Sequence, residues 1–193
     1  MNSLYINEKK FISVSADTTL FEKGEYESCT FINCNFANAD FSGFIFFQCV
    51  FEGCNLSLVK LQKTSLREVL FKDCKISGVQ FEHTNEFGLS FNFTHCIIHN
   101  SSFFNMSMKN TQFKNCEIHE TDFSESDLRE SLFEYCDFLG STFNRTNLEK
   151  SDFRTSYNYS IDPNINKIKK AIFGMSGVIG LLGKYGIEID TNM

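Results

Sequence analysis

Large apolar residues recur at every fifth position along most of this chain. Between residues 133 and 153 the sequence reads FEYCDFLGSTFNRTNLEKSDF, so Phe or Leu stands at each fifth residue. A helix needs an apolar residue about every 3.6 positions, and a half-buried strand needs one at every second position. The five-residue period therefore predicts neither a long helix nor an ordinary sheet, and it indicates an internal repeat.

The period passes through 25 apolar positions, called lattice centres below, with one change of phase. The first series spans residues 26–81 and the second spans residues 93–153. The segment between them contains two residues more than the period allows, because Phe81 and Phe93 are 12 positions apart and not 10. We predict a two-residue register break at 82–92. The residues at its centre are Glu86, Phe87 and Gly88.

The position two before each centre is small in most repeats. All eight cysteines stand at this position, and Ser or Thr replaces Cys in most of the later repeats. The spacing C-x4-C would also suit a metal or a disulfide, but a free buried cysteine behaves as a small apolar residue, which is what this position requires. Six cysteines are 20 or 22 residues apart and should form one structural ladder. They are Cys34, Cys54, Cys74, Cys96, Cys116 and Cys136.

This alternation of small and large positions resembles the pattern of the pentapeptide repeat family over about residues 26–155. The resemblance implies an all-β solenoid, a right-handed quadrilateral β-helix with four five-residue sides to each coil and six to seven coils in this segment. Neighbouring coils would stack at the usual strand spacing of about 4.8 Å. We expect residues 1–25 to form an N-terminal cap and first partial coil. Residues 156–193 should form a loop, a last partial coil and a C-terminal cap or dimerisation segment.

The C-terminal part of the chain allows two interpretations. Phe173 lies 20 residues after Phe153 and so returns to the phase of the period, which favours a last partial coil. Asp162 and Pro163 would equally suit the start of a helix over 163–172. The stretch GVIGLLGKYG then predicts a short helical cap. The resemblance implies that such an apolar segment joins two rods end to end in a homodimer, and its candidate residues are Ile179, Leu181, Leu182, Tyr185 and Ile187.

Charge and motifs exclude several classes of function. The net charge of -6 disfavours a nucleic-acid binder that works through a basic surface. No targeting segment or membrane-spanning stretch stands out, so we expect a cytoplasmic protein without membrane contact. There is no nucleophile motif and no phosphate-binding loop, and we expect neither catalysis nor a cofactor nor a metal. His99 and His119 lie one coil apart and should point to solvent.

Acidic residues are concentrated in residues 117–152, a segment that contains ten acidic residues and only three basic ones. They are Glu117, Glu120, Asp122, Glu125, Asp127, Glu130, Glu134, Asp137, Glu149 and Asp152. The resemblance to Qnr-like quinolone-resistance members implies a rod that imitates DNA, binds DNA gyrase or topoisomerase IV and protects it from quinolones or toxins. The alternative is a protein-binding or structural scaffold module with an unknown partner. A continuous acidic strip would favour mimicry, whereas interleaved charges would favour the scaffold.

Overall fold

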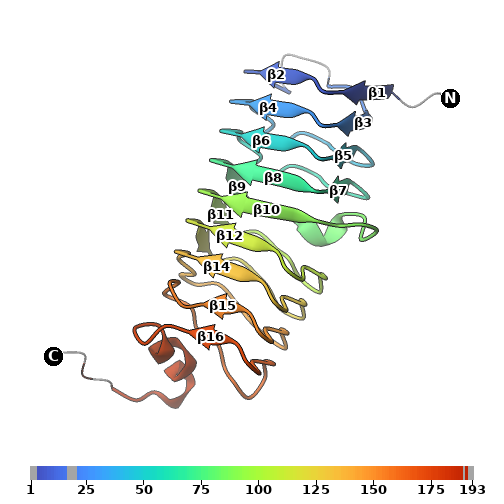
Figure 1. Ribbon diagram of the computed structural model, residues 1–193. Helices are drawn as coiled ribbons and strands as arrows, with labels where there is room; N and C mark the ends of the chain where they lie inside the picture. Colours follow the sequence, from blue (N-terminus) through green and yellow to red (C-terminus); the bar gives the residue numbers. More distant parts are fainter. Residues whose placement is uncertain (1–3, 17–20, 189, 191–193) are drawn as a thin grey trace.

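The chain winds into a β-helix with four faces, seen from the side in the computed structural model of Figure 1. The structure describes residues 4–16, 21–188 and 190. Most coils contribute one strand or one β-bridge to each face, and the faces are called face A to face D in the order in which the chain meets them. All pairings between coils are parallel, and most join residues 20 positions apart, as Phe31 and Phe51 are. The predicted all-β solenoid with four-sided coils is thus confirmed.

Face B is the most continuous face, and it carries one sheet from the first coil to the last. Its nine strands follow one another down the rod in Figure 1. They are β2 (Lys10–Ile12), β4 (Thr30–Ile32), β6 (Val50–Glu52), β8 (Val69–Lys72), β10 (Phe91–Thr94), β12 (Gln112–Lys114), β14 (Leu132–Glu134), β15 (Asp152–Phe153) and β16 (Ile172–Phe173). At about 4.8 Å between strands this sheet is roughly 38 Å long. The sheet therefore extends beyond residues 26–155 at both ends.

The other faces are less regular. Face A has four strands, β1 (Leu4–Asn7), β3 (Gly24–Glu27), β5 (Ile45–Phe47) and β7 (Ser65–Arg67). Face C has three strands, β9 (Lys75–Ser77), β11 (Ile97–His99) and β13 (Glu117–His119). Face D pairs through isolated bridges such as Ser102↔Asp122. The regular pairing of face A stops at β7, directly before the predicted register break.

The lattice centres fill the inside of the rod. Phenylalanine rings of successive coils stack almost parallel, with centroid separations of 4.6 Å for Phe31 and Phe51 and 4.9 Å for Phe93 and Phe113. These rings are almost completely buried. Burial of apolar surface is the main stabilising contribution to folding, and offset aromatic pairs add to it. One residue type dominates the core because every coil offers the same space.

The small position before each centre also points inward. All eight cysteines are buried with free thiols. Most of the thiols and many of the hydroxyls reach a backbone carbonyl 23 positions back, as Cys54 Sγ does to Phe31 O at 3.3 Å and Ser141 Oγ does to Ile118 O at 2.6 Å. Burial raises the pKa of the Cys49 thiol to about 12. The Cys116 and Cys74 thiols, together with burial, raise the pKa of Cys96. Such neutral thiols are poor nucleophiles.

Left-handed residues turn the chain at its corners. The residue two after most lattice centres has φ between +50° and +71°, as in Asn33, Glu68 and Gly140. Non-glycine residues rarely adopt this conformation, and the tightly packed coil imposes it on them here. His83 holds the equivalent place before the register break but does not adopt it, because the chain instead forms the 3-10 turn η1 (Phe81–His83). The next left-handed residue is Gly88, with φ of +68°.

Both ends of the rod are closed by residues that continue the repeat. β1 and β2 pair in register with β3 and β4, so the described part of residues 1–25 forms a coil. At the other end β16 pairs with β15 and extends face B by one strand, and residues 163–172 do not form the alternative helix. Two short 3-10 helices follow, η2 (Val178–Leu181) and η3 (Gly183–Tyr185), and the second ends at the left-handed Gly186.

Candidate functional site

The register break interrupts face A between β7 and the bridge at Ser107. β10 pairs with β8 at an offset of 22 residues, so Phe91 lies opposite Val69, whereas the pairing of β10 with β12 returns to an offset of 20. The two additional residues are accommodated in a turn at residues 87 and 88. Figure 1 shows this segment protruding from the side of the rod next to β10. The break is thus a small loop on one face.

Hydrogen bonds from Asn85 hold this loop against the coil above. The backbone N–H of Asn85 donates to Thr64 O at 2.8 Å, and its side-chain amide donates to Ser65 Oγ at 3.3 Å. Its side-chain oxygen accepts the N–H of Phe87 at 3.0 Å, which is a typical Asx turn. Asn85 therefore fixes the position of Phe87.

Phe87 is the exposed tip of the loop. Its side chain is 75% exposed, and the guanidinium of Arg67 lies 5.2 Å from the centre of its ring. This cation–π contact orients both side chains. The sequence identified Phe87 but not Arg67, because the contact depends on how the extra residues fold back over β7.

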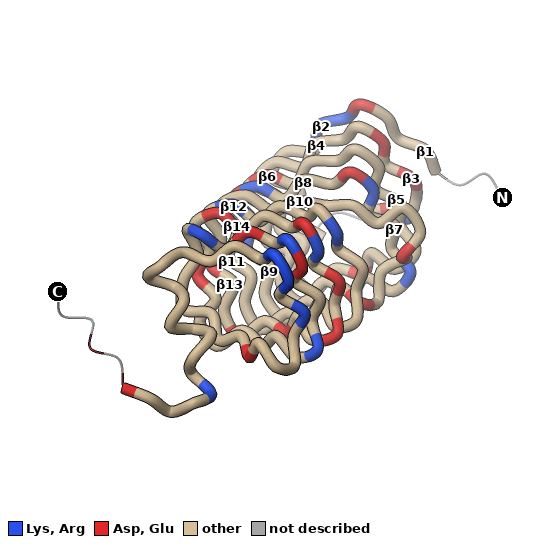
Figure 2. Tube along the Cα trace, turned by 60° about the horizontal axis from the view of Figure 1, so that its bottom comes forward, with Lys and Arg blue, Asp and Glu red and all other residues tan. Residues whose placement is uncertain are grey.

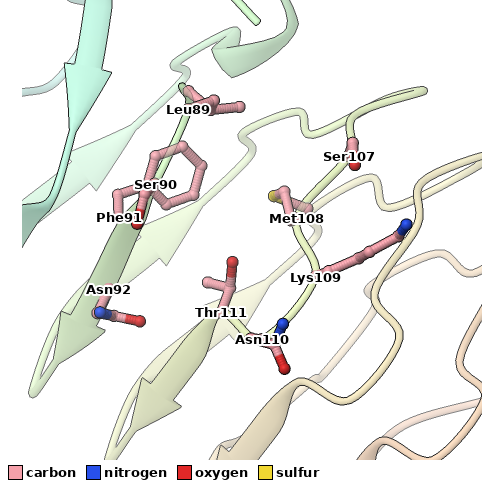
Figure 3. A pocket seen from close by; sticks show the side chains of 9 residues that line it. All are labelled: Leu89, Ser90, Phe91, Asn92, Ser107, Met108, Lys109, Asn110 and Thr111. Atoms are coloured by element: carbon pink, nitrogen blue, oxygen red, sulfur yellow. The ribbon is translucent and has the colours of Figure 1, made fainter. Parts of the chain in front are cut away.

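Two hollows lie on either side of the chain that leaves the loop. The larger has a volume of about 250 Å³, and its lining includes Glu82, Glu86, Leu89 and Phe104. The smaller has a volume of about 100 Å³ and is shown in Figure 3. Its lining residues are Leu89, Ser90, Phe91, Asn92, Ser107, Met108, Lys109, Asn110 and Thr111. The register break, Arg67 and these hollows are called the break surface below.

The ten acidic residues of 117–152 do not form one strip. Consecutive repeats lie on different faces, so residues close in sequence are turned away from one another. Glu117 and Asp137 lie on face C, Asp122 on face D, Asp127 on face A and Glu134 on face B. Figure 2 shows acidic and basic residues alternating along the rod. By the criterion set above, this interleaving favours a mixed surface over an extended imitation of DNA.

Five of these ten carboxylates lie next to a lysine or an arginine. The ion pairs of this region join Glu125 to Arg145, Glu130 to Lys150, Asp127 to Arg129 and Lys109, Glu134 to Lys114, and Asp152 to Arg154. Hydrogen bonds from Arg129 hold the pKa of Asp127 below its usual range, and Arg154 does the same for Asp152. Exposed pairs of this kind contribute little to stability. Their effect is to neutralise the acidic segment locally.

The C-terminal segment lies against the last coil through some of its apolar residues and exposes others. Leu181 packs on the core, and Gly180 lies against the ring of Tyr159, where a side chain would collide with it. Leu182 is half-buried, whereas Ile179, Tyr185 and Ile187 are exposed. The five predicted residues therefore divide between covering the rod and facing outward. None of the described helices is both long enough and apolar enough to cross a bilayer.

Comparison with protein families gives one match. The model of the family described as "Pentapeptide repeat region" matches residues 25–92 and 88–153, which is more than half of the chain. This chain belongs to the pentapeptide repeat family. The comparison with curated proteins gave no match.

Solved structures give matches at low sequence identity. Full-length QnrB1, a plasmid-mediated fluoroquinolone resistance protein, matches with a TM-score of 0.54 and 17% identity over 95% of this chain and 100% of that chain. A trypsin-treated QnrB1 matches with a TM-score of 0.49 and 19% identity over 97% of this chain and 98% of that chain. A pentapeptide repeat protein, Rfr23 from the cyanobacterium Cyanothece 51142, matches with a TM-score of 0.24 and 12% identity over 66% of this chain and 89% of that chain. The full-length QnrB1 match shows that the two chains share a fold.

Proposed function

We propose that this protein binds another protein through the side of its rod, without catalysing a reaction, and that the partner is a type II topoisomerase. The observation that carries the proposal is the break surface. Here an exposed aromatic ring contacts an arginine, and Glu86 and Leu89, which flank the tip of the loop, line one or both of the hollows. Aromatic and arginine side chains are the residue types that most often dominate the energy of protein interfaces.

The choice of partner rests on the fold and on the family resemblance. QnrB1, whose fold this chain shares, is a fluoroquinolone resistance protein. The resemblance to Qnr-like members implies DNA gyrase or topoisomerase IV as the partner. The cytoplasmic location predicted from the sequence would bring the rod to these enzymes. We therefore take DNA gyrase and topoisomerase IV as the two partners to test.

The negative charge of the rod is too small for the rod to imitate the DNA backbone along its whole length. Duplex DNA carries one charge per roughly 1.7 Å, which is roughly 22 charges over the length of face B. The whole chain has a net charge of -6, and half of the carboxylates in its acidic segment are paired with lysine or arginine. The proposed contact therefore depends on shape and on the break surface, and imitation of DNA is limited to short acidic stretches.

The test is a DNA supercoiling assay with gyrase, and a decatenation assay with topoisomerase IV, each with and without a fluoroquinolone. We expect micromolar protein to inhibit the enzyme or to relieve its inhibition by the drug. Phe87→Ala should weaken this effect at least tenfold. Tyr135→Ala is the matched control, because Tyr135 is also an exposed aromatic residue at a corner, 58% exposed, but lies on face B. No effect on either enzyme would contradict the choice of partner and would favour a scaffold module with another partner.

We further propose that two rods associate through their C-terminal ends. The exposed apolar residues Met175, Ile179, Tyr185 and Ile187 would be covered in such a homodimer. Light scattering should give twice the mass of the chain at micromolar concentration, and Ile179→Glu should give the mass of one chain. A single-chain mass for the unmodified protein would contradict the dimer.

A further inference from the structure

Face C places two histidines directly above one another. β11 and β13 pair in register, so His99 lies opposite His119, and the inward residues before them are Ile98 and Ile118. The two imidazole rings are parallel, with their centroids 4.7 Å apart and their planes at 6°. The rings lie on the outer surface, but only 31% and 24% of the two side chains is exposed. Stacking of one coil on the next covers the rest.

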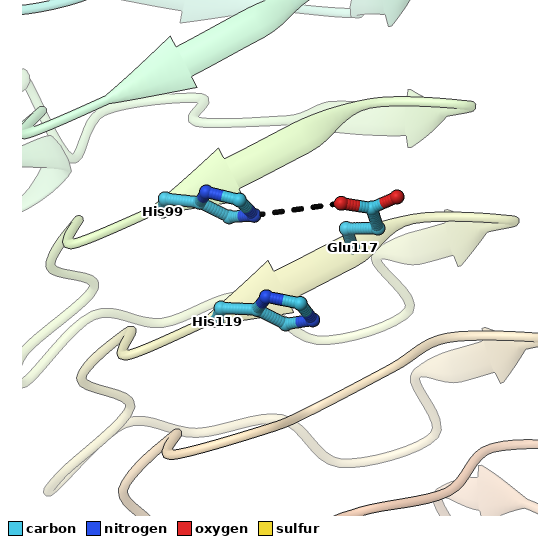
Figure 4. A group of neighbouring side chains, drawn as sticks. All are labelled: His99, Glu117 and His119. Carbon is cyan, nitrogen blue, oxygen red and sulfur yellow. Dashed lines mark ion pairs between the residues drawn. The ribbon is translucent and has the colours of Figure 1, made fainter.

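A carboxylate completes this pair of rings. Glu117 lies two positions before His119 on the same strand, and its Oε2 is 3.7 Å from Nε2 of His99. Figure 4 shows both Nε2 atoms and the Glu117 carboxylate turned to the same side of the sheet. The ligand atoms that the three residues offer all lie within 4.8 Å of one another. In the part of the chain that the structure describes, this is the one group of at least three such residues with this geometry.

The two Nε2 atoms are the second observation that points to a ligand. Each is inaccessible to solvent, and neither has a hydrogen-bond partner among the described residues. Buried polar atoms are normally hydrogen-bonded, so two of them side by side call for an explanation. Oδ2 of Asp137 lies 3.1 Å from Nε2 of His119 but without the alignment of a hydrogen bond. Its other oxygen accepts from Asn158 Nδ2 at 2.8 Å, which holds this second carboxylate in place.

We propose that His99, His119 and Glu117 bind a divalent transition-metal ion, Zn²⁺ in the first instance, and so link two neighbouring coils. Two imidazoles and one carboxylate are a ligand set that zinc uses in proteins, with a fourth position left for water. Ligand atoms around a tetrahedral zinc ion are about 3.4 Å apart. Rotation of the partly exposed side chains would have to bring the three atoms together by about an ångström.

The other candidate ligands do not compete with this assignment. The cysteines point into the rod and are buried, whereas the histidines lie on its outer surface. His95 lies at a corner of face B with one carboxylate nearby, Asp73, at 3.5 Å. His95 is therefore a suitable control, because it is an exposed histidine with an acidic neighbour but without a second imidazole.

The experiment titrates metal-free protein with Zn²⁺ in a calorimeter and with Co²⁺ in an absorption spectrometer. We expect one ion per chain, an increase of the melting temperature with Zn²⁺, and a Co²⁺ spectrum without thiolate charge-transfer bands. His99→Gln and His119→Gln should each weaken binding at least tenfold, and Glu117→Gln should weaken it about tenfold. His95→Gln should bind as the unmodified protein does. Melting of each metal-free variant shows whether it remains folded.

Several results would overturn the proposal. One is the lack of saturable binding below millimolar Zn²⁺. Another is unchanged affinity in folded His99→Gln and His119→Gln. Thiolate bands with Co²⁺ would assign the ion to the cysteines, and a loss of affinity with Asp137→Asn but not with Glu117→Gln would overturn the choice of carboxylate.

Discussion

The coils above and below the register break share one interior but differ in how they build it. Above the break Cys is the commonest residue at the small inward position, and thiols reach the carbonyl 23 residues back at 3.2 to 3.6 Å, as in Cys49 and Cys29. Below it the position is mostly Ser or Thr, and hydroxyls such as those of Ser131 and Ser156 reach the equivalent carbonyl at 3.0 and 2.8 Å. The position therefore selects for small size, and where its side chain donates a hydrogen bond, either a thiol or a hydroxyl supplies it.

The two regions differ more on the outside. Above the break, face A is a four-stranded sheet, whereas below it the same face pairs through single bridges such as Ser107↔Asp127. The ion pairs between Arg or Lys and the carboxylates of residues 117–152 all lie below the break. The interior thus repeats under strict constraints of space, while the surface is free to vary. Function is to be sought where the surface departs from the repeat.

The largest effect expected within this comparison is the loss of a core ring. Phe133 is fully buried and stacks on Phe113 at 5.3 Å and on Phe153 at 4.4 Å. Phe133→Ala should lower the free energy of unfolding by about 3 to 5 kcal/mol, because it leaves a cavity. Phe51→Ala, above the break, should cost a similar amount in urea unfolding. A loss below about 1 kcal/mol at either site would break the claim of a common interior.

Overpacking of the small position should have the next largest effect. Cys116→Leu adds a branched side chain to the cysteine ladder and should cost about 1 to 3 kcal/mol. Cys116→Ser keeps the size and the donor and should cost less, since hydroxyls fill this position in the coils below. Thermal melting of the two variants measures the difference. Equal tolerance of Leu and Ser would show that the position is not crowded.

Loss of one hydroxyl below the break should cost about 1 to 2 kcal/mol. Ser141 Oγ donates to Ile118 O at 2.6 Å and accepts the N–H of Thr121 at 3.2 Å. Ser141→Ala leaves both buried backbone groups without this partner. Ser141→Cys should restore most of the stability if thiol and hydroxyl are interchangeable. A Cys variant no more stable than the Ala variant would refute that equivalence.

The smallest effect expected is that of a surface ion pair. Arg129 lowers the pKa of Asp127, so this pair stabilises the fold above the ordinary pKa of Asp, and the contribution is lost as the pH falls through the lowered value. Arg129→Gln should raise the pKa of Asp127 in an NMR titration towards 3.8 and leave the free energy of unfolding at pH 7 almost unchanged. An unchanged pKa would show that Arg129 is not the cause.

The fold was predictable from sequence because the inward positions carry the whole signal. Lattice centres such as Phe31 and small positions such as Cys54 recur at fixed spacing, and the spacing itself gives the coil. The surface was less predictable. Glu117 and Asp122 are close in sequence but turn onto different faces, so the acidic segment looked like one cluster when it is not.

Contacts between coils explain what the sequence missed at the candidate sites. The contact of Arg67 with Phe87 depends on the fold of the inserted loop, which has no counterpart in the repeat. The spacing of 20 residues between His99 and His119 did predict that they stack. It did not predict that the next coil would cover them or that Glu117 would lie beside His99.

The salt dependence of binding to DNA gyrase tests the central claim most directly. Affinity of the unmodified protein and of Phe87→Ala should be measured between about 50 and 200 mM salt. If the break surface makes the contact, affinity should change by less than about tenfold over this range and should fall at least tenfold with Phe87→Ala. A protein that replaces DNA by its charge would instead lose about 10³-fold or more over the same range. That steep loss, together with no effect of Phe87→Ala, would contradict the account.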